Sequence, residues 1–170
     1  EKEDVVLTVC FVSTENIRVK GLDTFINAAR QLPEVRFVLL GGALDNVLKD
    51  LKQDAPRNVK FVQPSSPDEL LNWYRRAKVY CQLSYRESFG MALAEAMSCE
   101  CVPVVTDRGA LPEVVGDVGF VVPYGDTRAT ADAISRALIS GMGPAARERA
   151  CEIFSAEHRG QEIRRVITTL

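Results

Sequence analysis

Two carboxylates, Glu87 and Glu95, stand eight residues apart in the stretch ESFGMALAEAM, which covers residues 87–97 and is otherwise small or apolar. Glycine suits a tight helix entry, and Ala, Leu and Met are good helix formers, so we expect a helix to begin near Gly90. Its first amides would be unpaired at the positive end of the helix dipole, which binds anions such as phosphate. These amides belong to Gly90, Met91, Ala92 and Leu93.

The two acids of this stretch have two interpretations. An acid in the second helical turn could hydrogen-bond the vicinal hydroxyls of a ribose, as acidic residues do in dinucleotide sites. Alternatively, Glu95 faces solvent, and Glu87 is one of the acids favoured near a helix N-terminus. The spacing by itself favours the second interpretation, because acids are common at helix starts.

Cations occur in an earlier turn, STENIRVKGLD, which follows the first apolar run of the chain. Arg18 and Lys20 stand there just before an amphipathic helix, with Gly21 beside them. Cations at that position could neutralise a diphosphate leaving group. The alternative is a solvated loop, which this turn by itself favours.

Two further turns carry weaker signals. Gly41 and Gly42 follow the second apolar run, where they could let a ligand approach the backbone or simply fit a strand-to-helix turn. The third run ends in FVQPSS, which is uncharged. There, Val62 and its neighbours could wall a nucleobase with main-chain groups.

Short apolar runs alternate with helical periods along the chain. We expect strands over residues 5–12, 35–42, 58–63, 78–84, 101–106 and 118–123. We expect helices over 21–32, 44–53 and 66–77, near Gly90, near Pro112, and two or three times from Asp126 onward. Near-continuously apolar strands separated by helices indicate a parallel sheet covered on both faces. The sequence therefore predicts an α/β fold, a Rossmann-like doubly wound parallel sheet of about six strands, with ligands beyond the carboxyl ends of the strands.

Composition excludes several classes of function. The formal net charge of -2, from 21 basic and 23 acidic residues, gives no nucleic-acid surface and no polybasic membrane patch. No stretch approaches the ~20 apolar residues that span a bilayer. The single histidine, His158, excludes a His-based triad and a His metal cluster, and the five scattered cysteines indicate reduced thiols in a cytoplasmic protein. Because the chain starts at Glu1 without a Met, we expect a single domain that is part of a longer protein.

Residues 87–126, ESFGMALAEAMSCECVPVVTDRGALPEVVGDVGFVVPYGD, resemble the E-x7-E signature region of family 4 retaining glycosyltransferases. That region reads E-x-F-G-x4-E-A-M, followed by a valine strand, G-x-x-P-E-x-x and G-x-x-V-P-x-G-D. Upstream, RVKGLDTFINAARQLPEVRFVLLGG is similar to the family's K-G helix and its second strand. The resemblance spans nearly all of the chain, and it favours the functional interpretation of Glu87 and Glu95.

The resemblance implies a GT-B architecture, in which two Rossmann-like domains face each other across a cleft and residues 1–170 form the C-terminal, donor-binding domain. It implies that Glu95 holds the donor ribose, that Glu87 lies by the donor sugar as the catalytic residue, and that Lys20 contacts the diphosphate. The amides of Phe89 and the four residues after it would contact sugar and phosphate. No cofactor and no divalent metal is implied. The acceptor, a glycan or lipid, and any peripheral membrane association would come through the other domain.

One departure from the family pattern keeps alternatives open. Many members carry Gly-Arg about five residues before the lysine, whereas this chain has Thr14 and Glu15 there. A carboxylate facing a diphosphate would repel it. Either Arg18, two residues before Lys20, substitutes for that arginine, or the loop is rearranged and Glu15 points away. A non-catalytic nucleotide-binding domain is the alternative function, while a dinucleotide enzyme is disfavoured because no G-x-G-x-x-G follows the first strand.

Overall fold

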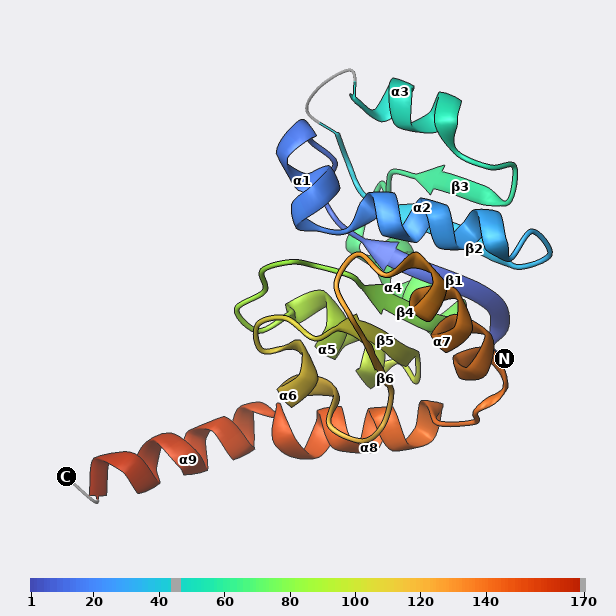
Figure 1. The fold of residues 1–170 in the computed structure, drawn as a ribbon. Helices are drawn as coiled ribbons and strands as arrows, with labels where there is room; N and C mark the ends of the chain where they lie inside the picture. The colour runs from blue at the N-terminus through green and yellow to red at the C-terminus, as the bar shows by residue number, and fades with distance from the viewer. Residues whose placement is uncertain (44–46, 169–170) are drawn as a thin grey trace.

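Strands and helices alternate along residues 1–43 and 47–168, the residues that the computed structural model describes (Figure 1). The strands are β1 (Glu3–Val9), β2 (Arg36–Leu40), β3 (Val59–Val62), β4 (Ala77–Gln82), β5 (Val102–Thr106) and β6 (Phe120–Val122). The helices are α1 (Thr14–Val19), α2 (Leu22–Gln31), α3 (Val47–Asp54), α4 (Pro67–Arg76), α5 (Met91–Ser98), α6 (Leu111–Val115), α7 (Thr127–Ile139), α8 (Gly143–Ile153) and α9 (Ala156–Thr168). Residues 44–46 of the helix predicted over 44–53 lie outside the described residues.

The strands form one parallel six-stranded sheet in the order β3-β2-β1-β4-β5-β6. This is the strand order of the doubly wound Rossmann fold. In β1, β2, β4 and β5 the side chains on either face of the sheet are mostly apolar and buried, because helices cover both faces. The predicted fold class is confirmed.

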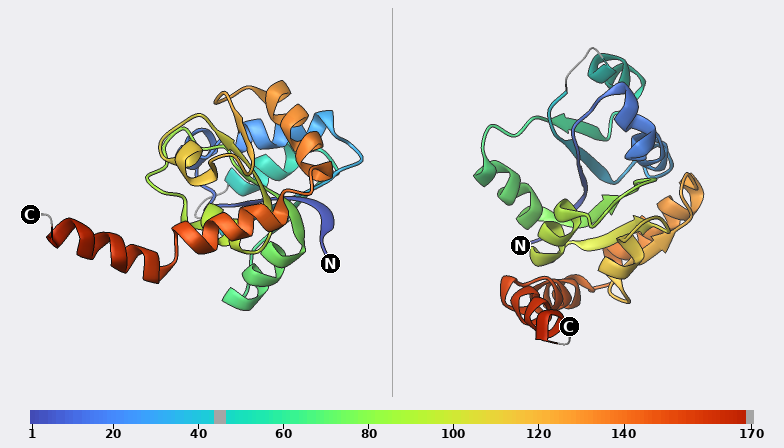
Figure 2. Two further views of the ribbon diagram at one scale, coloured as in Figure 1. Left: turned by 90° about the horizontal axis from the view of Figure 1, so that it is seen from below. Right: turned by 90° about the vertical axis from the view of Figure 1, so that its left-hand side faces the viewer.

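Two apolar cores lie on opposite faces of the sheet (Figure 2). Helices α2, α3 and α7 pack on one face, where the rings of Phe25 and Phe37 meet edge to face with centroids 5.2 Å apart. Helices α4, α5, α6 and α8 pack on the other face, where Tyr74 meets Tyr80 at 6.0 Å. Each fully buried aromatic of this kind contributes about 1.5–3 kcal/mol through burial alone. Helix α9 runs from α8 away from the sheet (Figures 1 and 2).

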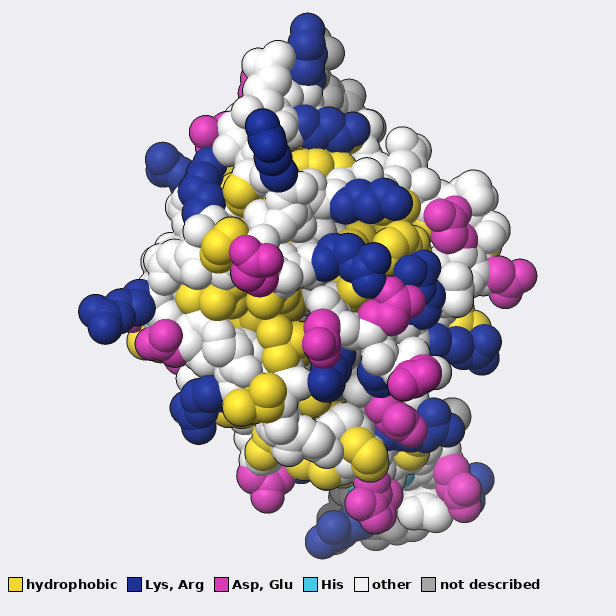
Figure 3. Space-filling view, turned by 90° about the vertical axis from the view of Figure 1, so that its right-hand side faces the viewer, with side chains coloured by type: hydrophobic (Ala, Val, Ile, Leu, Met, Phe, Trp, Pro, Cys, Tyr) yellow, Lys and Arg dark blue, Asp and Glu magenta, His cyan; other side chains and the backbone are white. Residues whose placement is uncertain are grey.

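Charges of both signs cover the surface on the side where the N-terminus lies in Figure 1. Figure 3 shows that face, with basic and acidic side chains interspersed over most of it and apolar side chains between them. The mixture agrees with the formal net charge of -2. Among the helices of the described residues, none combines the length and the apolar character that crossing a membrane requires.

Two local predictions were wrong. The first strand was expected to run to Val12, but β1 ends at Val9, and Val12 forms only an isolated bridge with Ala43. The turn before Lys20 was expected to be a loop, but Thr14–Val19 forms the short helix α1. The Ser13 side chain accepts a hydrogen bond from the Asn16 N–H at the start of α1, which satisfies one of the amides that a helix start leaves unpaired. A short helix of this kind has too few turns to show an apolar period in the sequence.

Helix α4 begins as the sequence predicts, with Ser66 as N-cap and Pro67 at its first position. The Ser66 hydroxyl accepts a hydrogen bond from the Glu69 N–H at 3.2 Å. We expect Ser66→Ala to lower the free energy of unfolding by about 1 kcal/mol, because that amide loses its partner. Denaturant unfolding measures the change, and Ser135→Ala, inside α7, is the control. Equal losses in the two variants would contradict the capping role.

Candidate functional site

The centre of the sheet is the point where the strand order reverses. From β1 the chain turns toward β2 on one side, whereas from β4 it turns toward β5 on the other. Ligands of doubly wound sheets bind in the crevice beyond the carboxyl ends of such strands. The segment after β1 carries Lys20, and the segment after β4 carries Glu87. Two residues 67 positions apart in the sequence therefore meet at this crevice.

A cavity of about 420 Å³, called the Glu87 cavity below, opens between these two segments. Its lining includes six residues that the sequence predicts for the site, namely Lys20, Glu87, Phe89, Gly90, Met91 and Ala92. It also includes residues that sequence reasoning missed, namely Cys10, Phe11, Asn16, Gln82 and Ser88. The structure thus brings the predicted cation, acid and helix start together around one space.

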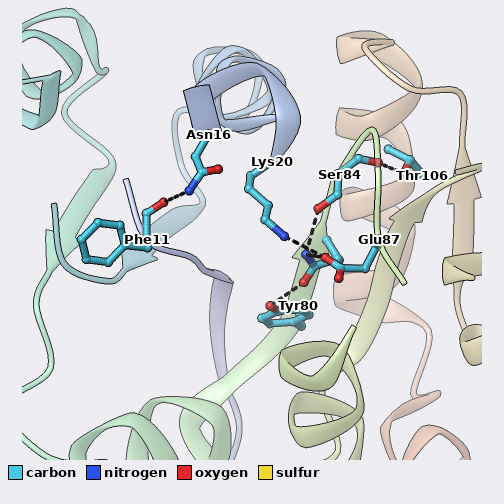
Figure 4. A network of polar contacts seen from close by, with 8 residues as sticks. Phe11, Asn16, Lys20, Tyr80, Ser84, Glu87 and Thr106 are labelled. Carbon is cyan, nitrogen blue, oxygen red and sulfur yellow. Dashed lines mark hydrogen bonds and ion pairs between the residues drawn. The ribbon is translucent and has the colours of Figure 1, made fainter. Parts of the chain in front are cut away.

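An ion pair joins the two charged residues of the cavity. The Lys20 ammonium donates to Oε2 of Glu87 at 2.9 Å, and the side chains are 28% and 17% exposed (Figure 4). The amide of Gln82 donates to the same oxygen at 3.2 Å. The Glu87 backbone is held as well, because its carbonyl accepts from the Ala110 N–H at 3.2 Å. Glu87 is therefore a fixed carboxylate whose charge is partly balanced by a cation.

Helix α5 begins where the sequence predicts an anion-binding helix end. Gly90 is its N-cap, with φ of 89°, a left-handed conformation that glycine adopts without strain. The prediction that the Leu93 amide is unpaired is wrong. Its N–H donates to the Gly90 carbonyl at 2.9 Å, and its side chain is buried. The amides of Met91 and Ala92, which line the cavity, lie in the turn whose N–H groups have no partner within the helix.

Glu95 lies farther along the same helix, outside the lining of the Glu87 cavity. It accepts a hydrogen bond from the Tyr74 hydroxyl at 3.1 Å and lines a second cavity of about 380 Å³ between α4 and α5. Burial, and then the negative charge of Glu95, raise the pKa of Tyr74, so its hydroxyl stays a proton donor. Because Met91 and Ala92 precede Glu95 by four and three residues, one helix face joins the two cavities.

The glycine pair and Val62 are tied into the sheet. The Gly41 N–H donates to the Val62 carbonyl at 2.8 Å, and the Gly42 carbonyl accepts from the Val12 N–H at 2.8 Å. A Cβ on Gly41 would lie 1.8 Å from the Cys10 carbonyl oxygen, so only glycine fits there. This close approach is a structural reason for the glycine. None of the three predicted residues lines the Glu87 cavity, and their contact with a ligand stays a prediction.

Helix α1 decides which residues of the STENIRVKG turn reach the cavity. Asn16 and Lys20 line it, four residues apart as on one helix face. Arg18 and Glu15 are exposed and do not line it. The Arg18 carbonyl accepts from the Tyr124 hydroxyl at 2.7 Å. Of the two alternatives for the Thr14-Glu15 departure, the exposure of Glu15 outside the cavity favours the one in which it points away, and Arg18 does not reach the lining that Lys20 shares.

The residues that sequence reasoning missed have separate roles in the wall. Asn16 donates to the Phe11 carbonyl at 2.8 Å, which holds the segment after β1 against α1 (Figure 4). Burial raises the pKa of the Cys10 thiol to about 11, so the thiol is neutral and not a nucleophile near pH 7. Among these residues, Gln82 has a signal in the sequence, because a glutamine buried in the apolar run KVYCQLS needs a hydrogen-bond partner.

In the described ranges, 1–43 and 47–168, no three His, Cys, Asp or Glu residues lie close enough together to hold a metal ion. The predicted independence from a divalent metal stays a prediction.

A doubly wound sheet with a lysine, a carboxylate and a helix N-terminus at its switch point defines a Rossmann-like domain whose crevice carries groups that suit an anionic ligand. Residues 4–152 match the family model described as glycosyl transferases group 1. The chain therefore belongs to this glycosyltransferase family, and the predicted family with its GT-B fold is confirmed.

Individual relatives cover the chain well but extend far beyond it. The D-inositol 3-phosphate glycosyltransferase of Mycobacteroides abscessus is 36% identical over 145 residues, 78% of this chain and 33% of the relative. The alpha-galactosylglucosyldiacylglycerol synthase of Streptococcus pneumoniae is 31% identical over 119 residues, 66% of this chain and 30% of the relative. The structure of Anabaena Alr3699/HepE in complex with UDP and glucose matches with a TM-score of 0.83 and 24% identity, over 99% of this chain and 49% of that one. The chain thus spans about a third of these curated relatives and half of the solved neighbour.

Proposed function

We propose that residues 1–170 form the donor-binding domain of a retaining glycosyltransferase that transfers a sugar from a nucleotide-diphosphate sugar. The observation that carries the proposal is a cavity lined together by Lys20, Glu87 and the first turn of α5. These are the groups that such a donor needs: a cation and amides for the diphosphate, and a carboxylate for the sugar hydroxyls.

The chemistry follows from where charge develops. When the bond between sugar and diphosphate breaks, negative charge grows on the leaving phosphate. The Lys20 ammonium and the amides of Met91 and Ala92 would stabilise that charge without a metal ion. Glu87 would accept hydrogen bonds from the donor sugar and hold it in line, and Glu95 would accept from the ribose hydroxyls, with Tyr74 orienting its carboxylate. Retention of the anomeric configuration is proposed from the family resemblance, and NMR of the product tests it.

The nature of donor and acceptor is proposed at the level of class. The neighbour that was solved with UDP favours a uridine diphosphate sugar. The names of the relatives favour a polyol phosphate, glycan or lipid acceptor, bound through parts of the protein beyond this chain. A cytoplasmic site of action, with peripheral membrane association through those other parts, completes the proposal.

Calorimetry on the full-length protein with UDP, GDP and ADP tests donor binding. Glu95→Ala should weaken binding of the preferred diphosphate about 10-fold or more, because hydrogen bonds to a charged group are lost. The 2′-deoxy nucleotide should bind the natural protein more weakly, and the variant should discriminate less between the two nucleotides. Glu148→Ala, an exposed acid on α8, is the matched control. Failure of every nucleotide to bind the natural protein, or unchanged discrimination in the variant, would contradict the proposal.

A non-catalytic nucleotide-binding domain is the alternative function. Its motivation is the carboxylate of Glu15 at a position where the family often has arginine. Since Glu15 is exposed and does not line the Glu87 cavity, that motivation is weakened. Release of nucleoside diphosphate from a nucleotide sugar by the full-length protein separates the alternatives, because the non-catalytic domain would bind without turnover.

A further inference from the structure

A buried polar row lies behind Glu87 on strand β4. Tyr80 and Gln82 stand two residues apart in β4, followed by Ser84 two residues later, so that all three alternate with the apolar residues between them. Their exposed fractions are 0%, 6% and 0%. Burying an amide in an apolar strand is costly unless its hydrogen bonds are made. A leucine at position 82 would avoid that cost, so the glutamine needs another explanation.

The hydrogen bonds of Gln82 fix the direction in which its amide points. Its carbonyl oxygen accepts from the Tyr80 hydroxyl at 2.8 Å. Its NH₂ group donates to the Ser84 hydroxyl at 2.9 Å and to Oε2 of Glu87 at 3.2 Å. The reverse orientation would set the amide oxygen against a carboxylate oxygen, and both are acceptors. Burial raises the pKa of Tyr80 well above its ordinary value, so this hydroxyl remains a donor to Gln82.

Glu87 is held by two donors on one oxygen. Lys20 and Gln82 both donate to Oε2, and the described residues show no hydrogen bond to Oε1. Oε1 is thus left available to a ligand in the cavity that Glu87 lines. The two donors differ in mobility, because lysine is a long, flexible side chain with 28% exposure, whereas Gln82 is clamped inside the sheet.

We propose that Gln82, oriented by Tyr80, is a positioning residue that holds the Glu87 carboxylate toward the donor sugar when Lys20 turns to the diphosphate. The inference rests on the proposed function, because it assigns sugar and diphosphate to this cavity. It explains why a buried amide stands at this strand end. It also gives Lys20 freedom to serve the phosphate without releasing the carboxylate that contacts the sugar.

The test compares a nucleotide with and without its sugar on the full-length protein. Gln82→Met keeps the length of the side chain and removes its donor. We expect the affinity for UDP to change less than twofold, while the affinity for UDP-glucose falls about 5- to 10-fold and donor turnover falls about 10-fold. If the natural protein prefers another base or sugar, the corresponding pair is used. Tyr80→Phe should act in the same direction with a smaller effect, since it removes only the donor that orients Gln82.

Thr106→Val is the matched control. Its hydroxyl, also buried, donates to the Ser84 carbonyl at 2.6 Å (Figure 4), and among the described residues it makes no hydrogen bond with Gln82 or Glu87. It should lower stability and leave the ratio of the two affinities unchanged. Equal loss of both affinities in Gln82→Met, or a ratio like that of Thr106→Val, would overturn the positioning role.

A second measurement keeps the inference separate from the proposed function. Ligand-free crystal structures of Lys20→Met and of the double variant Lys20→Met, Gln82→Met (or Lys20→Met, Gln82→Leu if the first does not fold) show whether the Glu87 carboxylate stays in place once Lys20 no longer holds it. We expect it to stay in place in Lys20→Met and to move or lose order in the double variant. An unmoved carboxylate overturns the inference even if donors bind, whereas a moved carboxylate with no nucleotide binding overturns only the proposed function.

Discussion

Glu87→Gln is expected to slow donor turnover by the full-length protein about 10²- to 10³-fold, while its affinity for nucleoside diphosphate rises. Turnover falls because a neutral amide replaces the carboxylate that faces the donor sugar, and losses of this size follow removal of one preorganised group from an active site. Affinity for the diphosphate rises because Lys20, now paired with Glu87 at 2.9 Å, is released to the phosphate. Diphosphate release from a nucleotide sugar measures the first effect, and calorimetry measures the second.

The opposite signs of the two effects make this prediction specific. General damage to the site would lower turnover and affinity together. Glu15→Gln removes a carboxylate from the neighbouring helix α1, outside the cavity, and should change both quantities less than twofold. A large effect of Glu15→Gln, or a loss of diphosphate affinity in Glu87→Gln, would contradict the geometry around Lys20 and Glu87.

The fold was predictable because its signal is carried by many residues at once. Continuously apolar runs such as that around Val38 and Val104 are needed wherever helices cover both faces of a sheet, so they recur in every central strand. The N-cap at Ser66 and the entry glycine of α5 are likewise local and follow from backbone geometry. The end of β1 was less predictable, because an apolar side chain such as Val12 can be buried without belonging to a strand.

The site residues were predictable where they belong to a sequence motif. They were not predictable where the fold decides which of several adjacent residues reaches the cavity. Lys20 and Glu87 come from the motif and do meet in one cavity. Whether Arg18 joins them depends on α1, since a helical turn places residues 16 and 20 on the cavity and 18 away from it. The role of Gln82 depends on the alternation of side chains along β4. This alternation brings its amide to the carboxylate only if the loop after β4 places Glu87 on the same face. Such relations depend on how each side chain is placed in space, and a single sequence does not give that placement.

Lys20→Met is expected to weaken nucleoside diphosphate binding by the full-length protein about 10- to 100-fold. Hydrogen bonds to a charged group contribute about 1.5–3 kcal/mol, and the variant loses those of the ammonium. It also leaves Glu87 with Gln82 as its one remaining side-chain donor among the described residues, so that the carboxylate faces the diphosphate as an unneutralised charge. Calorimetry at two salt concentrations is the measurement. The dependence of affinity on salt should become weaker in the variant, because one cation that meets the phosphates has been removed.

Arg18→Met decides between the two cations that the sequence offers for the diphosphate. Since Arg18 is exposed and does not line the cavity, its replacement should change affinity less than threefold. If Arg18→Met has the larger effect, α1 must turn in the complex to bring the arginine to the phosphates.

The double variant Lys20→Met, Glu87→Gln should bind diphosphate more tightly than Lys20→Met alone, because the carboxylate that repels the phosphates is gone. If the second substitution restores nothing, the ion pair is not part of the donor site.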